Sequence, residues 1–379
     1  MSAVYVHVPF CSQRCSYCDF YFVTSTNLKD DYLRAFEQEV VLRSEAGWDR
    51  RPIQTLYFGG GTPSLLAPAD IQGMVAAVHE ALDLSVLRET TLELNPENGS
   101  PAYLEAIRHA GIDRLSIGVQ SFDEEILRFM KRSHDARDAQ RVIGSARSAG
   151  FDNFSVDLIF GIPGQSDEDW LRTLDTVLDY NVPHLSIYGL TIEPKTLLNR
   201  WVEQGHVEPA GEERFAAQYM ATIERLEAAG YEHYEAASFA RDGLRSQHNQ
   251  QYWTHGEYLG LGPAAHGFEW QDEPVRSSNV RSIRKYVELL SAGQRPVDEE
   301  EVLAPEDLAD ERIMLRLRTS DGLNLRELRD RYGYDLQSKR EDDVHGLLEA
   351  GYALLDGDHL KLTQHGRLFT DAIIGRLIS

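Results

Sequence analysis

The chain has 379 residues and a mass of 42.9 kDa, enough for a large barrel or sheet domain with a smaller domain beside it. Its 38 basic and 61 acidic residues give a net charge of -23, and this field disfavours nucleic acid as a general partner because it repels phosphate. No apolar run approaches the length of about 18 residues that a membrane span requires, and residues 1–8 lack a basic leader. We therefore expect a soluble, cytoplasmic protein.

Strands alternate with helices along the first half of the chain. Short runs of β-branched and aromatic residues predict six strands, at 4–8, 55–58, 90–94, 114–119, 154–160 and 184–190. Amphipathic patterns predict helices between them, at 29–44, 69–82, 101–110, 136–149 and 167–180. This alternation predicts parallel strands with right-handed crossovers, the arrangement of a parallel α/β barrel or sheet.

The three cysteines of the chain lie together after the first predicted strand, as Cys11, Cys15 and Cys18. Their odd number in a long chain disfavours a disulfide framework. Structural zinc needs a fourth ligand, for example His7. Three thiolates on a [4Fe-4S] cluster would instead leave one iron open for a ligand, and the residues that follow favour this interpretation.

Polar residues recur where the predicted strands end. They are Gly59 to Thr62 after the second strand, Glu93 and Asn95, Gln120 and Ser121, Asp157 on the fifth strand, and Tyr188 near the end of the sixth. Because the C-terminal rim of a parallel barrel is its active face, these side chains are predicted to meet the cysteines around one cavity. The alternatives are a plain glycine turn and, if the strand phase is off by one, surface carboxylates.

These segments together resemble the radical S-adenosylmethionine superfamily and, within it, the anaerobic coproporphyrinogen III oxidase family. The motifs are Cys-x3-Cys-x2-Cys, Gly-Gly-Gly-Thr-Pro-Ser, Leu-Asn-Pro-Glu, Ser-Ile-Gly-Val-Gln-Ser-Phe and Asp-Leu-Ile-Phe-Gly-Ile-Pro-Gly. The resemblance implies a partial (β/α)6 TIM-like barrel with a [4Fe-4S] cluster on Cys11, Cys15 and Cys18, whose open iron binds S-adenosylmethionine (SAM). By the same matching, the implied SAM contacts are Tyr5, Tyr17, Gly60, Gly61, Thr62, Glu93, Gln120, Arg132 and Asp157.

Two departures from the decarboxylating enzyme point to the heme chaperone (HemW) subgroup. Phe20 stands where that enzyme has a further cysteine, and only ten residues precede Cys11. Residues 247–253 add His248 with two following aromatics. Taken alone they favour a surface histidine, but their match to the His-Asn-x-x-Tyr-Trp motif of the heme chaperones implies His248 as a heme ligand. His266 is a weaker ligand candidate, and we expect for it a buried, hydrogen-bonded role near the barrel mouth.

The C-terminal part changes to helices, predicted at 283–292, 308–317, 325–332 and 338–350, then a hairpin around Asp356-Gly357 and a last helix at 363–377. This order predicts a winged-helix-like unit. From residue 301 on there are 11 Lys or Arg against 16 Asp or Glu, so DNA binding is disfavoured and a protein contact surface or a lid fits better. The predicted domains are the radical SAM barrel at 1–235, a connecting segment at 236–300 and the winged-helix-like domain at 301–379.

The resemblance implies a heme chaperone that binds heme, a [4Fe-4S] cluster and exchangeable SAM, and that delivers heme to an acceptor protein such as a membrane-bound respiratory enzyme. It would associate with a membrane at most peripherally. The alternative is a radical SAM enzyme acting on a tetrapyrrole, although coproporphyrinogen decarboxylation is disfavoured by Phe20. A winged-helix transcriptional regulator is disfavoured by charge.

Overall fold

A curved parallel sheet forms the body of the protein. The structure is a computed structural model and describes residues 2–270 and 272–378, within which one sheet holds 12 strands. Its centre is β1 (Ser2–Val8), β2 (Ile53–Gly60), β3 (Glu89–Leu94), β4 (Arg114–Gln120), β5 (Asn153–Phe160) and β6 (His184–Gly189). Each pairs in parallel with the next, so the six predicted strands and the partial barrel are confirmed.

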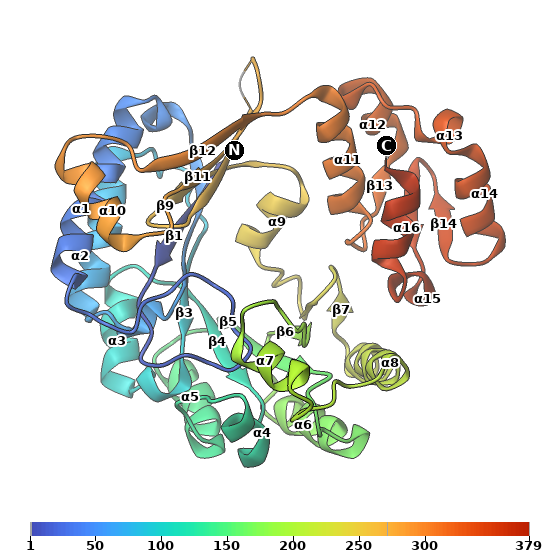
Figure 1. Cartoon of the computed structure of the whole chain (residues 1–379), viewed down its shortest axis with the longest axis horizontal. Helices are drawn as coiled ribbons and strands as arrows, with labels where there is room; N and C mark the ends of the chain where they lie inside the picture. Colours follow the sequence, from blue (N-terminus) through green and yellow to red (C-terminus); the bar gives the residue numbers. More distant parts are fainter. Residues whose placement is uncertain (1, 271, 379) are drawn as a thin grey trace.

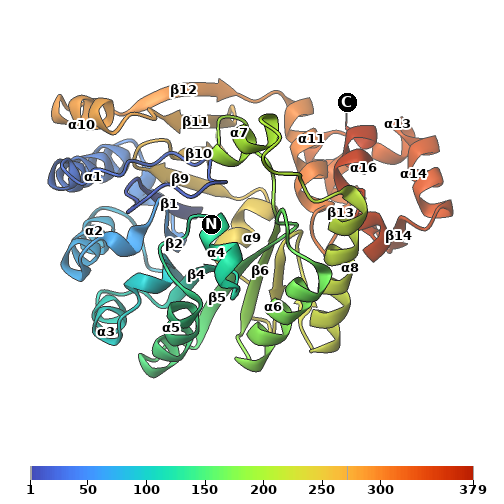
Figure 2. The same ribbon diagram turned by 60° about the horizontal axis from the view of Figure 1, so that its bottom comes forward.

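Helices cover the outer face of these strands, as Figure 2 shows. The predicted helices are confirmed as α1 (Lys29–Glu45), α2 (Pro68–Ala81), α3 (Pro101–His109), α5 (Ala136–Ser148) and α6 (Asp167–Asp179). Polar caps fix where two of them begin, since Asp135 accepts from the backbone of Asp138 and Ser166 from that of Asp169. Helices α4 (Glu124–Phe129), α7 (Leu197–Glu203) and α8 (Glu212–Ala228) were not predicted.

The sheet continues past both ends of the barrel strands. Strand β9 (Glu257–Leu261) runs parallel to β1, followed by antiparallel β10 (His266–Glu269), β11 (Val275–Asn279) and β12 (Val297–Val302). On the other side β8 (Ser238–Ala240) and β7 (Glu232–His233) follow β6. Sequence patterning missed these strands because several, such as the Val-Asp-Glu-Glu-Glu-Val of β12, are polar and exposed and carry no alternating apolar signal.

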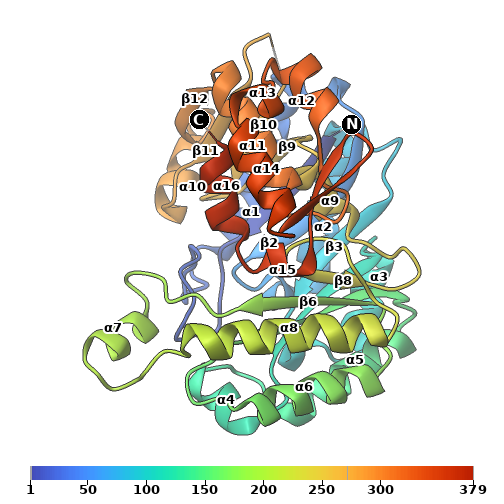
Figure 3. The ribbon, with the colours of Figure 1, turned by 90° about the vertical axis from the view of Figure 1, so that its right-hand side faces the viewer.

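The C-terminal helices form a separate lobe beside the barrel (Figures 1 and 3). The lobe comprises α11 (Pro305–Arg316), α12 (Leu325–Tyr332), α13 (Leu336–Lys339), α14 (Glu341–Glu349), α15 (Gln364–Arg367), α16 (Thr370–Leu377), β13 (Leu323–Asn324), β14 (Ala353–Asp356) and β15 (His359–Leu362). Its apolar core is distinct from that of the barrel. The predicted hairpin is confirmed, but the helices predicted at 338–350 and 363–377 are each broken. Arg340 and Phe369 leave helical dihedrals there.

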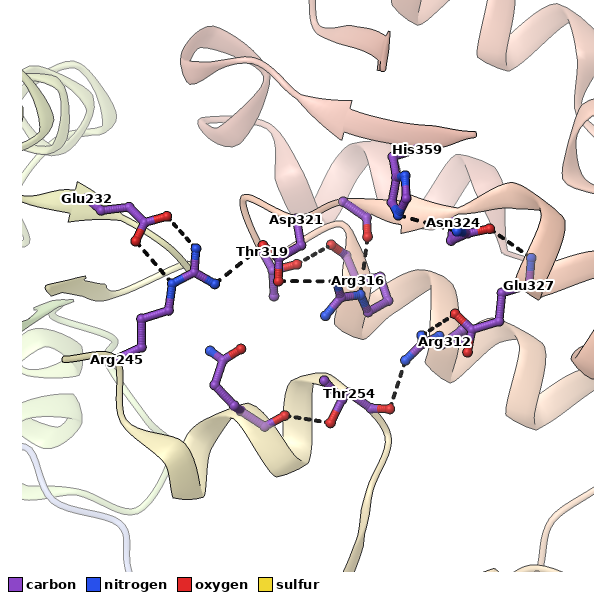
Figure 4. Close-up of polar contacts among 12 residues, drawn as sticks. Glu232, Arg245, Thr254, Arg312, Arg316, Thr319, Asp321, Asn324, Glu327 and His359 are labelled. Carbon is purple, nitrogen blue, oxygen red and sulfur yellow. Dashed lines mark hydrogen bonds and ion pairs between the residues drawn. The ribbon is translucent and has the colours of Figure 1, made fainter. Parts of the chain in front are cut away.

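The segment that joins the two lobes contains α9 (Gln247–Trp253) and, after β11, α10 (Ile283–Ser291). The residues on either side of α9 contact the C-terminal lobe: Arg312 donates to the carbonyl of Thr254 at 2.9 Å, and Arg245 pairs with Asp321 (Figure 4). None of the helices in the described ranges has the length and apolar character needed to cross a membrane. The α9 helix is thus fixed between the barrel and the C-terminal lobe.

Candidate functional site

A cavity of about 410 Å³ opens at the C-terminal ends of the parallel strands. The three cysteines line it. Eight of the nine predicted SAM contacts also line it: Tyr17, Gly60, Gly61, Thr62, Glu93, Gln120, Arg132 and Asp157. Tyr5 does not, because it lies lower in β1 with its ring beside Tyr57, at a centroid distance of 6.1 Å. The predicted convergence at the rim is therefore confirmed except for Gly59 and Ser121, which do not line the cavity, while the contacts to SAM stay a prediction.

The loop that carries the cysteines is held by backbone hydrogen bonds. Cys11 donates to the carbonyl of Val23 at 3.0 Å, and Ser16 to that of Met130 at 3.1 Å. Two donors reach the sulfurs, Thr62 Oγ1 at 3.6 Å from Cys11 Sγ and an Arg132 Nη1 at 3.6 Å from Cys15 Sγ. The Thr62 bond lowers the pKa of the Cys11 thiol, but burial outweighs it and raises that pKa to about 11.

The residue suggested as a fourth zinc ligand is engaged elsewhere. In the described parts of the chain, no group of three or more His, Cys, Asp or Glu side chains is arranged to hold a metal ion. His7, the suggested fourth zinc ligand, already has both ring nitrogens engaged, with Tyr5 Oη at 3.2 Å and the carbonyl of Tyr21 at 2.9 Å.

Glu93 presents a carboxylate to the cavity from the end of β3. Tyr57 donates its hydroxyl to Glu93 Oε1 at 3.0 Å, and the Gly60 backbone donates to Oε2 at 3.1 Å. A side chain at Gly59 would exclude this geometry, since a Cβ there would lie 2.8 Å from Oε1. Burial, with a smaller effect of Asp157, raises the pKa of Glu93 to about 7, although the two hydrogen bonds act in the opposite direction.

Asp157 lies deeper in the barrel, on β5. Its carboxylate accepts from Ser116 and Ser155, each at 2.8 Å, and burial raises its pKa despite these bonds. Both carboxylates therefore face the interior, and the alternative of an off-phase surface position is wrong.

Arg132 and Gln120 occupy the rim beside β4. One Arg132 Nη2 donates to Asn95 Oδ1 and to the carbonyl of Gly118, both at 2.8 Å. The buried Nε of Arg132 has no hydrogen-bond partner among the described residues. Gln120 has a φ of 65°, a left-handed conformation that is uncommon outside glycine and is often found at functional sites.

His248 lies inside the barrel, below the cavity rather than on its wall. His248 is only 1% exposed, so the alternative of a surface histidine is wrong. Nδ1 bonds Thr55 Oγ1 and Nε2 bonds Tyr252 Oη, both at 2.8 Å. Burial lowers the pKa of His248 to about 3, which keeps the ring neutral. His266 is exposed, so the burial expected for it is also wrong.

Comparison with known proteins assigns the family. Residues 5–177 match the Radical SAM superfamily and residues 303–369 match the HemN C-terminal domain. The chain is 32% identical to a protein named heme chaperone HemW from Bacillus subtilis, over 100% of this chain and 99% of that protein. This chain belongs to the HemW family of radical SAM proteins. HemW of Mycobacterium tuberculosis is 35% identical over 99% of this chain and 94% of its own length.

The HemW-family chain also shares its fold with a solved structure, that of coproporphyrinogen III oxidase (HemN) from Escherichia coli. The TM-score is 0.84 at 24% identity, and the match covers 100% of this chain and 90% of that one. The mixed α/β barrel with a C-terminal domain is therefore the radical SAM fold as HemN has it.

The side chains of the cavity fit the groups that the HemW family implies. Membership in the radical SAM superfamily implies a [4Fe-4S] cluster and SAM, and a cluster on Cys11, Cys15 and Cys18 would supply an open iron for the amino and carboxylate groups of SAM. The unpartnered Nε of Arg132 suits a carboxylate, because it can donate one charge-assisted hydrogen bond to a carboxylate oxygen.

Sequence reasoning missed the residues directly below the cavity, chiefly Thr55 and Tyr57 on β2. A signal for them exists. Side chains alternate along a strand, and Thr55 and Tyr57 share their phase with Gly59, whose backbone adjoins Glu93. That phase predicts that both point to the barrel interior.

Proposed function

We propose that this chain is a heme chaperone, which binds heme and passes it to an acceptor protein, and which holds a [4Fe-4S] cluster and SAM in the cavity at the strand ends. The observation that carries this proposal is the similarity along the whole chain to proteins named heme chaperone HemW. The cysteine loop and the polar rim support the cluster and SAM part of the proposal.

His248 is the proposed heme ligand, and its surroundings support that role. Histidines that bind metal usually keep a hydrogen bond on the second ring nitrogen, which fixes the orientation of the ring. Thr55 provides this bond at Nδ1, while Nε2 is bonded to Tyr252. Coordination of heme iron at Nε2 would replace the Tyr252 bond, and it would require α9 to move, because His248 is buried.

Two donors on the same helix are available for the heme edge. Gln250 Nε2 and Trp253 Nε1 are buried and find no hydrogen-bond partner within the described residues. Buried donors without partners are costly and suggest a missing acceptor. The carboxylates of heme propionates would satisfy them.

The acceptor in this proposal is a protein, with a membrane-bound respiratory enzyme as one example, and nucleic acid is not a partner. The net charge of -23 supports this choice, since it repels phosphate. Contact with a membrane would be peripheral, and the proposed compartment is the cytoplasm, where thiols stay reduced.

A second candidate is a radical SAM enzyme that acts on a tetrapyrrole. The rim of the cavity supports it, because the three cysteines and eight of the nine residues predicted to contact SAM line that cavity. Phe20 opposes the known decarboxylation. Its side chain is 68% exposed beside the cysteine loop, and it cannot perform the chemistry of the cysteine found there in the decarboxylating enzyme.

The deciding experiment uses anaerobically purified protein with a reconstituted cluster. Heme is titrated by absorption spectroscopy into the wild type, His248→Ala and, as a control, His266→Ala, whose histidine is exposed. We expect tight binding by the wild type and the control and loss of binding by His248→Ala. 5'-Deoxyadenosine is assayed in parallel with coproporphyrinogen III. Absent heme binding together with substrate-dependent SAM cleavage would refute the chaperone and support the enzyme.

A further inference from the structure

A continuous series of side-chain contacts links His248 to the cavity. The His248 ring stacks on Tyr57 with a centroid distance of 4.9 Å and an interplanar angle of 26°. Tyr57 donates its hydroxyl to Glu93, and Glu93 also accepts from the Gly60 backbone. Glu93 and Gly60 line the cavity, whereas Tyr57 and His248 lie behind them.

Two rings stack on Tyr57 and help to hold it in place. His248 is the nearer, at a centroid distance of 4.9 Å, and Tyr5 lies at 6.1 Å with an interplanar angle of 25°. The Tyr57 oxygen lies on the axis through Cβ and Cζ, so rotation of the ring about this axis leaves it in place, and only a tilt of that axis moves the hydroxyl away from Glu93.

His248 is itself fixed from several elements, which makes it a rigid support. Thr55 on β2 bonds its Nδ1, and Tyr252 on α9 bonds its Nε2. Its backbone N–H donates to Glu89 on β3 at 3.0 Å. A side chain with every polar group satisfied inside the barrel holds its ring in one orientation.

We propose that His248 is a positioning residue for the SAM site, which acts through the stacked ring of Tyr57 on the carboxylate of Glu93. The inference rests on SAM binding in the cavity, as in the proposed function. It adds a role in which the flat ring of His248 makes the contact and its nitrogens only hold the ring in place, whereas heme ligation requires a nitrogen to bind iron.

This difference sets the experiment, which uses the full chain with its cluster reconstituted. SAM affinity is measured by anaerobic calorimetry in the wild type, His248→Ala, His248→Phe, Tyr57→Phe and the double variant His248→Ala/Tyr57→Phe. Phenylalanine keeps a flat ring against Tyr57 but offers no nitrogen. The matched control is His255→Ala, another buried histidine, which stacks on Phe268 at 4.8 Å beside the C-terminal lobe.

We expect His248→Ala to bind SAM about 3- to 10-fold more weakly, the range that loss of one aromatic contact corresponds to. His248→Phe should restore the affinity, and His255→Ala should not change it. Tyr57→Phe should weaken binding through the lost hydrogen bond, and the double variant should be no weaker than Tyr57→Phe, because both changes act through one route.

Wild-type SAM affinity in His248→Ala, or no recovery in His248→Phe, would overturn the proposal. Cluster content per chain and near-ultraviolet circular dichroism identify a variant that has not folded. If a His248 variant does not fold, the SAM affinity of Tyr57→Phe, which keeps its ring, tests the proposal instead. Unchanged affinity in that variant also overturns the proposal. Heme titration of the same samples separates the two roles: absent heme binding by the wild type refutes the chaperone but leaves the SAM result as it stands.

Discussion

Ionisation of Glu93 should lower the free energy of unfolding as the pH rises, and Glu93→Gln should abolish this loss of stability. The substitution keeps the shape of the side chain. The amide oxygen can still accept from the Gly60 N–H, and the amide nitrogen can donate to the Tyr57 hydroxyl oxygen. What changes is that glutamine cannot ionise.

The magnitude follows from the pKa of Glu93, which burial raises from 4.5 to about 7 in the folded protein. Below pH 4.5 the carboxyl is protonated in both states and has no effect. Between 4.5 and about 7 the folded state binds more protons than the unfolded state, so the free energy of unfolding falls as the pH rises. Above this window the ionised Glu93 lowers the free energy of unfolding by about 3 kcal/mol.

The assay is urea unfolding of the ligand-free protein, followed by tryptophan fluorescence, at pH 6 and pH 8. The advantage of Glu93→Gln over the wild type should grow by about 1.4 kcal/mol between these values. Glu224→Gln, at an exposed position on α8, should show no such growth. An equal difference between Glu93→Gln and the wild type at both pH values would refute the argument that burial of this carboxylate opposes folding.

Three further predictions concern the cluster, SAM and the lobe contact. Cys15→Ala should lose the [4Fe-4S] absorption after reconstitution while Ser12→Ala, in the same loop, keeps it, and a full spectrum in Cys15→Ala would contradict the cluster assignment. Arg132→Gln should weaken SAM binding by about 10- to 150-fold in calorimetry, the value of a charged hydrogen bond, and unchanged affinity would place the SAM carboxylate elsewhere. Arg312→Ala should lower the free energy of unfolding by about 1–3 kcal/mol, because the Thr254 carbonyl loses its donor; an unchanged unfolding curve would show that this contact adds no stability.

The barrel and its rim could be predicted because their signals are local. The spacing of the cysteines and the short apolar runs of β1 to β6 are visible among neighbouring residues. The polar residues of the rim lie at or directly after the strand ends in the sequence. The outer strands β11 and β12 have no such signal, since their polar residues pair through the backbone and depend on a neighbouring strand for their place.

The sequence by itself therefore determined the fold class, the cysteine site and the set of side chains at the strand ends. Only the tertiary structure decided where His248 lies. Its ring bonds Thr55, which is 193 residues away in the chain, and it stacks on Tyr57 two residues further along β2. A contact over such a separation depends on how α9 docks inside the barrel, and local patterns of residues carry no information about that docking.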